Sequence, residues 1–287
     1  LILDFMGCAN FVWSKHTLDQ REQMAIVQEL MPSVRTRLNI TRVPSREAGE
    51  IVPVSISSKF NAGKTGIFKS DLTSIKNGKV EKDGKIFNLE TSGGKCVVAV
   101  GAKGKGENTL PTEVRGIAVN EDVSSLIFLH ACALPSSNQK AYFNIPDFFD
   151  TSDLLGWYEI VYEDNYRISV PIQYGVNILE WNPGAEDRLD KMEGETGAAQ
   201  NVYAYNADPV QCSDASAARP VTFFAFEWIN PRFGKMIREV NVFGTINYQA
   251  TGTDYGKPAY SPLKSNAIML AGITKVKKTL PYVPKSE

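Results

Sequence analysis

The chain has 287 residues, of which 43% are hydrophobic, and its formal net charge at pH 7 is −1. This length and composition are sufficient to bury a large core, in one large β domain or in two smaller domains. The near-neutral charge gives no basic field for nucleic acid or acidic tail, so no polyanion partner is expected, and no stretch approaches the roughly twenty apolar residues of a membrane span.

The first 40 residues have a different pattern from the rest. A short apolar run at the start predicts a strand, and Thr17 and Gln20 then have the spacing of a capping box. Apolar residues recur afterwards at steps of three and four, which predicts one amphipathic helix over about 18–38 that Pro32 kinks or divides. This unit resembles the remnant of a preceding domain, residues 1–40. The alternative is an N-terminal helix packed on the domain that follows.

From Ile51 onward the sequence changes to short apolar segments separated by turns. Strands are predicted at residues 51–56, 96–100, 125–134, 221–228, 237–243 and 268–276. The segment Ser125 to Leu134 is apolar on both faces, which predicts a central strand that is covered on both sides. Lys82-Asp83-Gly84-Lys85 is typical of a hairpin turn.

The most regular pattern begins at Gly156 and ends at Trp181. Apolar and polar residues alternate on both sides of Asp164-Asn165, which predicts a β-hairpin. Asp and Asn tolerate positive φ, so a two-residue primed turn is expected between the strands.

Two longer segments are predicted to be irregular. Residues 183–220 are rich in Gly, Ala, Asp and Asn and are expected to form a long, functional loop, and residues 247–265 form a polar loop. About ten strands with no helical pattern between them predict a mostly β fold, a jelly-roll β-sandwich over residues 41–280.

Nucleophilic or zinc chemistry finds little support in the sequence. There is no G-x-S-x-G motif, and His130 alternates with apolar residues on a strand predicted to be buried, so it is expected to be a hydrogen-bonded core histidine. The four cysteines lie far apart without C-x-x-C spacing, which leaves two disulfides, one or none open. Cys132 is predicted to be a buried free thiol.

Aromatic residues at strand ends and in loops are the clearest functional pattern. Their flat faces can stack on the C–H faces of sugar rings while Asn, Glu and Arg bond the hydroxyls. Trp157 and Trp228 are expected to fill the core, whereas a platform and a core role are balanced for Trp181, Tyr203 and Tyr205. The candidate carbohydrate-binding residues are Trp181, Tyr203, Tyr205, Tyr174, Asn177, Glu227 and Trp228.

Acidic residues provide two further hypotheses. Glycoside hydrolysis needs two carboxylates, and Glu159, Glu180 and Glu227 are the acids nearest to aromatic residues. For Glu227, pairing with Arg232 or Arg238 is the simpler interpretation. A structural calcium ion has possible ligands in Glu186, Asp187 and Asp190, although these acids may also form a solvated loop, and their spacing matches no defined calcium loop.

Five segments occur in an order that resembles a known arrangement. They are Arg115-Gly-Ile-Ala-Val, Leu126-Ile-Phe-Leu-His130, Trp157-Tyr-Glu-Ile-Val-Tyr, Pro171-Ile-Gln-Tyr-Gly175-Val-Asn-Ile178 with Trp181, and Phe226-Glu-Trp-Ile-Asn-Pro231. Together they resemble the non-catalytic β-sandwich regions that lie C-terminal to catalytic barrels in large bacterial glycoside hydrolases. This resemblance implies a galactose-binding-like jelly roll that binds carbohydrate or supports the barrel.

The start of the chain resembles another part of such enzymes. Gly7-Cys-Ala-Asn-Phe-Val-Trp13, followed by a helix, is similar to the last strand and helix of a hexosaminidase-like (family 20 type) barrel. The resemblance implies that Trp13 lines a sugar pocket in the intact enzyme, and that the partners are carbohydrate and the parent protein's catalytic domain in an extracytoplasmic location. The alternatives are a structural spacer that docks on the barrel, and an autonomous glycoside hydrolase that uses a carboxylate pair.

Overall fold

The computed structural model describes residues 49–101, 110–134, 154–183, 204, 206–214, 216–232, 234–244, 248–254, 257–262 and 266–277. These ranges hold fourteen strands and one short 3₁₀ helix, and no α-helix occurs among them. No helix in the described ranges is long and apolar enough to cross a membrane. The predicted strand and helix of residues 1–40 lie outside these ranges.

The strands follow one another with short connections. They are β1 (Ile51–Val54), β2 (Gly78–Lys82), β3 (Lys85–Leu89), β4 (Val98–Gly101), β5 (Glu113–Glu121), β6 (Val123–Cys132), β7 (Leu154–Tyr162), β8 (Arg167–Gln173), β9 (Ala207–Gln211), β10 (Thr222–Ile229), β11 (Ile237–Gly244), β12 (Tyr248–Asp254), β13 (Lys257–Pro262) and β14 (Ala267–Lys277). The 3₁₀ helix η1 (Ser57–Lys59) follows β1.

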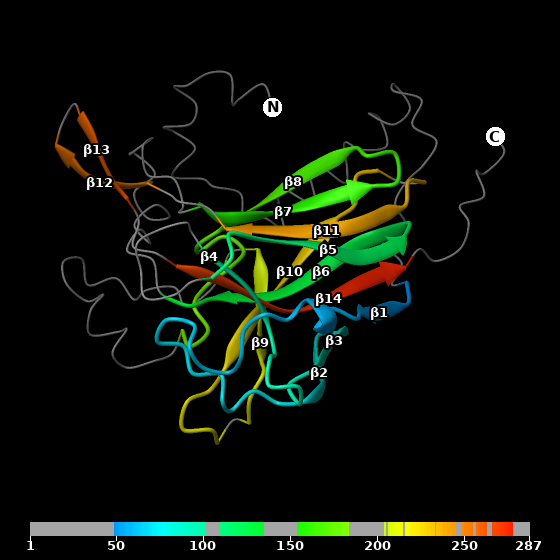
Figure 1. Ribbon diagram of the computed structural model, residues 1–287, viewed down its shortest axis with the longest axis horizontal. Helices are drawn as coiled ribbons and strands as arrows, with labels where there is room; N and C mark the ends of the chain where they lie inside the picture. The colour runs from blue at the N-terminus through cyan, green and yellow to red at the C-terminus, as the bar shows by residue number, and fades with distance from the viewer. Residues whose placement is uncertain are drawn as a thin grey trace, which may run out of the picture.

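Two antiparallel sheets form the body of the molecule (Figure 1). The main sheet has the order β1-β14-β6-β10-β9, with β4 also paired to β14, and the second sheet has the order β5-β11-β7-β8. β2-β3 and β12-β13 are separate two-stranded sheets. Side chains from both larger sheets meet in one hydrophobic cluster, as in a β-sandwich, so the expected mostly β fold is confirmed.

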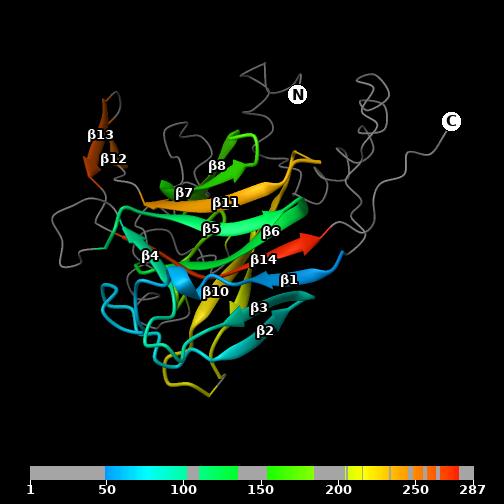
Figure 2. The same ribbon diagram turned by 45° about the vertical axis from the view of Figure 1, so that its right-hand side comes forward.

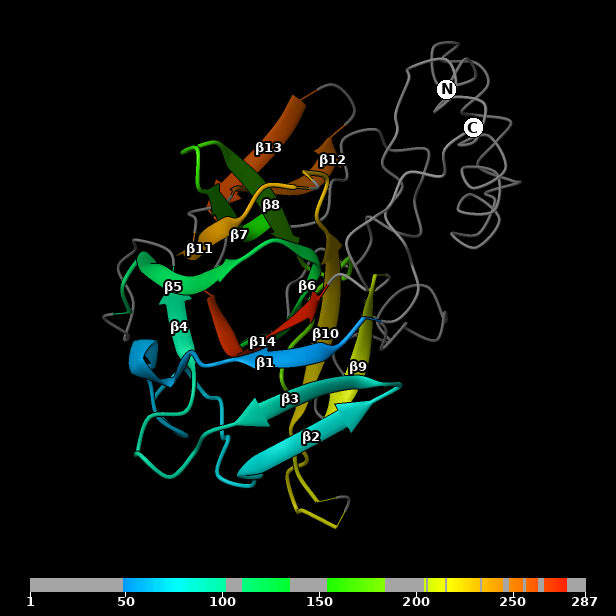
Figure 3. The same ribbon diagram turned by 90° about the vertical axis from the view of Figure 1, so that its right-hand side faces the viewer.

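The main sheet is covered on both of its faces. On β6, Leu126 and Phe128 point into the cluster between the two sheets, whereas Ile127 and Leu129 belong to a second cluster on the opposite face. The β2-β3 hairpin and the loops near it cover that second cluster (Figures 2 and 3). The prediction of a central strand buried on both sides is therefore confirmed, and two-sided burial explains its unbroken apolar run.

Both predicted hairpins are present, but they turn differently. Between β2 and β3, Asp83 and Gly84 both have positive φ, 50° and 79°, as a primed two-residue turn requires. Between β7 and β8 only Asn165 has positive φ, 64°, and its N–H donates to the Tyr162 carbonyl at 3.0 Å. The primed two-residue turn predicted there is wrong. A three-residue loop, in which one left-handed residue ends an ordinary turn, matches the strand twist equally well.

Three of the strands that sequence reasoning missed have polar or interrupted sequences. β9 lies inside the predicted irregular segment 183–220 and pairs with β10 despite its Asp208-Pro209 step. β12 and β13 occupy the segment predicted as a polar loop. These errors have one cause, because pairing with a neighbouring strand overrides weak local propensity.

Candidate functional site

Three of the predicted carbohydrate-binding residues lie inside the protein. Tyr174 is 1% exposed and its hydroxyl donates to Glu180 Oε2 at 2.6 Å. Trp181 is 9% exposed and packs in the second hydrophobic cluster. Asn177 is 4% exposed and its side chain bonds the backbone at Pro171 and Gln173. Their aromatic faces and polar atoms serve the fold, so these residues provide no sugar platform.

Glu227 and Trp228 lie near the end of β10. Glu227 is exposed and accepts a hydrogen bond from Ser125 Oγ at 2.6 Å. Its expected pairing with Arg232 or Arg238 is wrong, because these arginines bond Asp164 and Asn165 in the β7-β8 turn. Trp228 is half-buried against the main cluster, which confirms its expected core role.

The remaining predicted positions lie outside the described residues. They are Trp13, Tyr203, Tyr205 and the proposed calcium ligands Glu186, Asp187 and Asp190. Within the described part of the chain, no group of His, Cys, Asp and Glu could hold a metal ion. Cys96, Cys132 and Cys212 are buried and free, which confirms the prediction for Cys132.

His130 has the structural role that was expected. Its Nε2 lies 2.7 Å from the Asn177 carbonyl oxygen, and its Nδ1 lies 2.7 Å from the Tyr158 hydroxyl. Because a carbonyl can only accept, Nε2 carries the proton and the Tyr158 hydroxyl donates to Nδ1. Complete burial lowers the pKa of His130 to about 4, although the bond to Asn177 acts in the opposite direction, so the ring is neutral.

The candidate site lies on the outer face of the four-stranded sheet. On β7 the side chains of Tyr158 and Ile160 fill the core, so the residues between them point outward. Cross-strand pairing aligns outward residues in two rows. The apolar row contains Phe243, Trp157 and Pro171, and the polar row contains Asn241, Glu159 and Ser169.

The apolar row is a stack of flat groups that crosses the sheet. The rings of Trp157 and Phe243 are nearly parallel, at 8°, with centroids 5.0 Å apart. The Arg115 guanidinium lies 4.9 Å from the centroid of Phe243, on which it can make a cation–π contact. Trp157 was expected to fill the core but belongs to neither hydrophobic cluster of the described residues, so that prediction is wrong.

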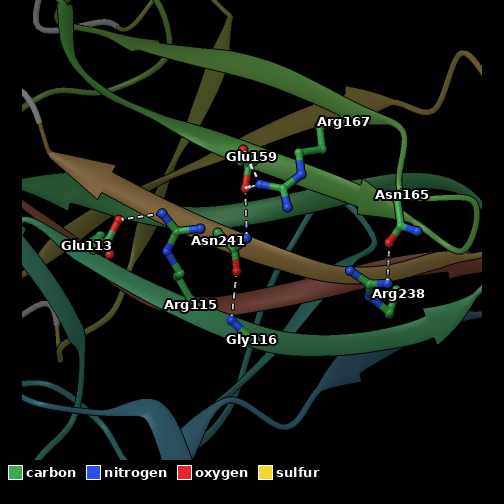
Figure 4. Close-up of polar contacts among 8 residues, drawn as sticks. All are labelled: Glu113, Arg115, Gly116, Glu159, Asn165, Arg167, Arg238 and Asn241. Atoms are coloured by element: carbon green, nitrogen blue, oxygen red, sulfur yellow. Dashed lines mark hydrogen bonds and ion pairs between the residues drawn. The ribbon is translucent and has the colours of Figure 1, made fainter.

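The polar row is a connected network of hydrogen bonds (Figure 4). Asn241, 1% exposed, accepts from the Gly116 N–H at 2.7 Å and donates to Glu159 Oε1 at 2.9 Å. Arg167 Nη1 lies 3.1 and 3.2 Å from the two oxygens of Glu159. Gly116 has φ of 74° at a bulge in β5, which aims its N–H at Asn241.

Glu159 is held in its charged form by this network. Partial burial of the carboxylate alone would raise its pKa, but the hydrogen bonds from Asn241 and Arg167 and the positive charges of Arg167 and Arg115 outweigh this effect. The pKa of Glu159 is therefore lowered. The carboxylate suits the role of a hydrogen-bond acceptor and does not suit the role of a general acid.

A second cluster fixes the end of the β7-β8 hairpin. Arg232 donates to both carboxylate oxygens of Asp164, at 3.0 and 2.8 Å, and lies 4.8 and 4.4 Å from the ring centroids of Tyr162 and Tyr166. The hydrogen bond from Arg232 lowers the pKa of Asp164 to about 2. The cluster joins the hairpin to the loop before β11, which keeps the outer face rigid.

Comparison of the chain with protein-family models, with curated protein sequences and with solved structures gives no match. The similarity to regions of bacterial glycoside hydrolases therefore stays a prediction from the sequence, and a function has to be argued from the geometry of the outer face.

Proposed function

We propose that this chain is a non-catalytic β-sandwich module that binds carbohydrate on the outer face of its four-stranded sheet. The observation that carries the proposal is the apolar row of Phe243, Trp157 and Pro171 beside the polar row of Asn241, Glu159 and Ser169. A sugar ring has apolar C–H groups and polar hydroxyls, so it can contact both rows at once. Both rows stand on paired strands, which hold their side chains in place before a ligand arrives.

The wider context is part of the same proposal. The sequence resemblance supports a galactose-binding-like jelly roll in an extracytoplasmic, polysaccharide-degrading glycoside hydrolase, where the module would support or target a catalytic barrel. An autonomous hydrolase receives less support, because a glycosidase needs one carboxyl group with a raised pKa, whereas the pKa of Glu159 is lowered.

A purely structural spacer is the second candidate. It is favoured by the interior positions of Tyr174 and Trp181 and by the core contact of Trp228. These aromatic residues stabilise the fold and leave only the outer face available for stacking. In this alternative the apolar row would contact a neighbouring domain in place of a sugar.

Titration calorimetry with plant, host and microbial glycans tests the proposal, with release of reducing sugar followed in parallel. We expect saturable binding without hydrolysis, weakened about tenfold or more in Trp157→Ala and Phe243→Ala because the stacked row is lost. Tyr166→Ala is the matched control, since this aromatic is 54% exposed but lies in the hairpin turn. Thermal unfolding of each variant separates lost binding from lost folding.

The alternatives give different results in the same titration. Saturable binding that is unchanged in both Trp157→Ala and Phe243→Ala would place the sugar site elsewhere on the protein. No binding to any glycan of the panel would make the structural spacer the better account.

A further inference from the structure

The outer face carries three arginines whose hydrogen-bonding capacity is only partly used within the described residues. Arg115 donates through Nη2 to Glu113 at 2.8 Å. Arg167 donates through Nη1 to Glu159, and Arg238 donates through Nη1 to Asn165 at 2.9 Å. A guanidinium has five N–H donors on three nitrogens, and each of these contacts uses one terminal nitrogen. Donors therefore remain available on every arginine of this face.

The acceptors of this face are engaged to a larger extent. Both oxygens of Glu159 face Arg167, and one of them also accepts from Asn241. The amide oxygen of Asn241 accepts from the Gly116 N–H, and the amide oxygen of Asn165 accepts from Arg238. A ligand that presents mainly acceptors fits this imbalance better than a neutral sugar, whose hydroxyls donate as well as accept.

Two of the arginines are also held in place before binding. Arg115 is fixed by Glu113 and by the ring of Phe243, and Arg167 is fixed by Glu159. Both contribute positive charge at Glu159, where they lower the pKa of its carboxyl group, so the two guanidinium groups lie near one another. Because their geometry is already set, little side-chain entropy is lost when an oxyanion binds to the remaining donors.

The attraction is local and not a property of the whole chain. Glu113, Glu159 and Glu239 balance the three arginine charges on this face, and the chain carries a net charge of −1. Such a surface does not draw long polyanions from a distance, in keeping with the exclusion of nucleic acid. It can bind a short ligand that places one charged group on the arginine donors and an apolar ring face on the neighbouring row.

We infer that the ligand of the outer face is an acidic oligosaccharide whose oxyanion, a carboxylate or a sulfate, is bound by Arg115 and Arg167 while its ring contacts the apolar row. This inference rests on the proposed function, because it names the class of carbohydrate for the same face. The two oxyanions share the chemistry that the guanidinium groups recognise, so the experiment includes both of them.

The test is calorimetric titration of the full chain with three probes of equal length: a galacturonic acid trisaccharide, a sulfated galactose trisaccharide and a neutral galactose trisaccharide. We expect at least one acidic probe to bind about tenfold more tightly than the neutral one. Arg115→Gln and Arg167→Gln should each weaken that acidic probe about tenfold and change the affinity of the neutral probe by less than about twofold. The acidic probe that binds more tightly identifies the oxyanion.

The control is Arg219→Gln in the β9-β10 loop, where an exposed arginine pairs with Asp71. Its affinity for all three probes should equal that of the unmodified protein. Equal affinity for acidic and neutral probes would overturn the inference and leave the proposed function standing, as would equal losses in Arg219→Gln and Arg115→Gln. If no probe binds and the wider glycan panel also gives no binding, both are overturned together.

Discussion

Gly156→Ala is expected to lower the free energy of unfolding by about 3 kcal/mol or more, because the position has no space for a side chain. A Cβ atom at Gly156 would lie 1.9 Å from the Phe243 carbonyl oxygen and 2.7 Å from Ile268 Cδ1. The backbone oxygen cannot move without breaking the β7-β11 pairing, and Trp157 follows directly in the chain. The change should therefore also displace the apolar row. Urea denaturation followed by circular dichroism measures the loss.

Gly93→Ala is the matched control for this substitution. Nothing lies within 4 Å of a Cβ atom at Gly93, and its φ is not in the left-handed region. The free energy of unfolding should change by no more than about 0.5 kcal/mol. Equal stability of Gly156→Ala and Gly93→Ala would show that β7 and β11 are not in such close contact.

The second large effect is a loss of stability as the pH falls from 6.5 to about 4. The pKa of His130 in the folded protein is about 4, below its ordinary value of 6.5, mainly because the ring is completely buried. Between these values the unfolded chain binds a proton at this residue and the folded chain does not. The contribution of His130 is therefore complete above pH 6.5 and falls by about 3 kcal/mol by pH 4.

Unfolding free energies of the unmodified protein, His130→Gln and His16→Gln at several pH values measure this contribution. His130→Gln should be less stable at pH 7 but should lose less stability on acidification, because the titrating ring is gone. His16→Gln removes the other histidine of the chain and should leave the slope unchanged. Identical slopes for all three proteins between pH 6.5 and 4.5 would contradict a neutral, buried His130.

Much of the fold was predictable where burial alone determines the residue type. β6 and β14 are apolar over most of their length because both faces of the main sheet are covered, and the β7-β8 alternation reflects one buried and one outer face. β9 was missed because its Asp208 and Pro209 are tolerated only through its position at the edge of the sheet. Residue type alone does not carry that positional information.

The site was harder to predict because aromatic residues look alike in sequence whether they pack or bind. Tyr174 is buried through a hydrogen bond to Glu180, and a contact of this kind has no local pattern. Trp157 was assigned to the core, although it lies on the same side of β7 as Glu159, which the strand period already indicated. Phe243 could be placed next to Trp157 only after the pairing of β11 with β7 was known.

The most direct test of carbohydrate binding on the outer face is to follow the indole N–H resonances of the four tryptophans by NMR while an acidic trisaccharide is added. The account predicts that the Trp157 resonance shifts saturably, because this ring lies in the apolar row, and that the resonances of Trp181 and Trp228 stay in place, because these rings contact the hydrophobic core. A saturable shift of Trp181 or Trp228 with an unchanged Trp157 would contradict the account.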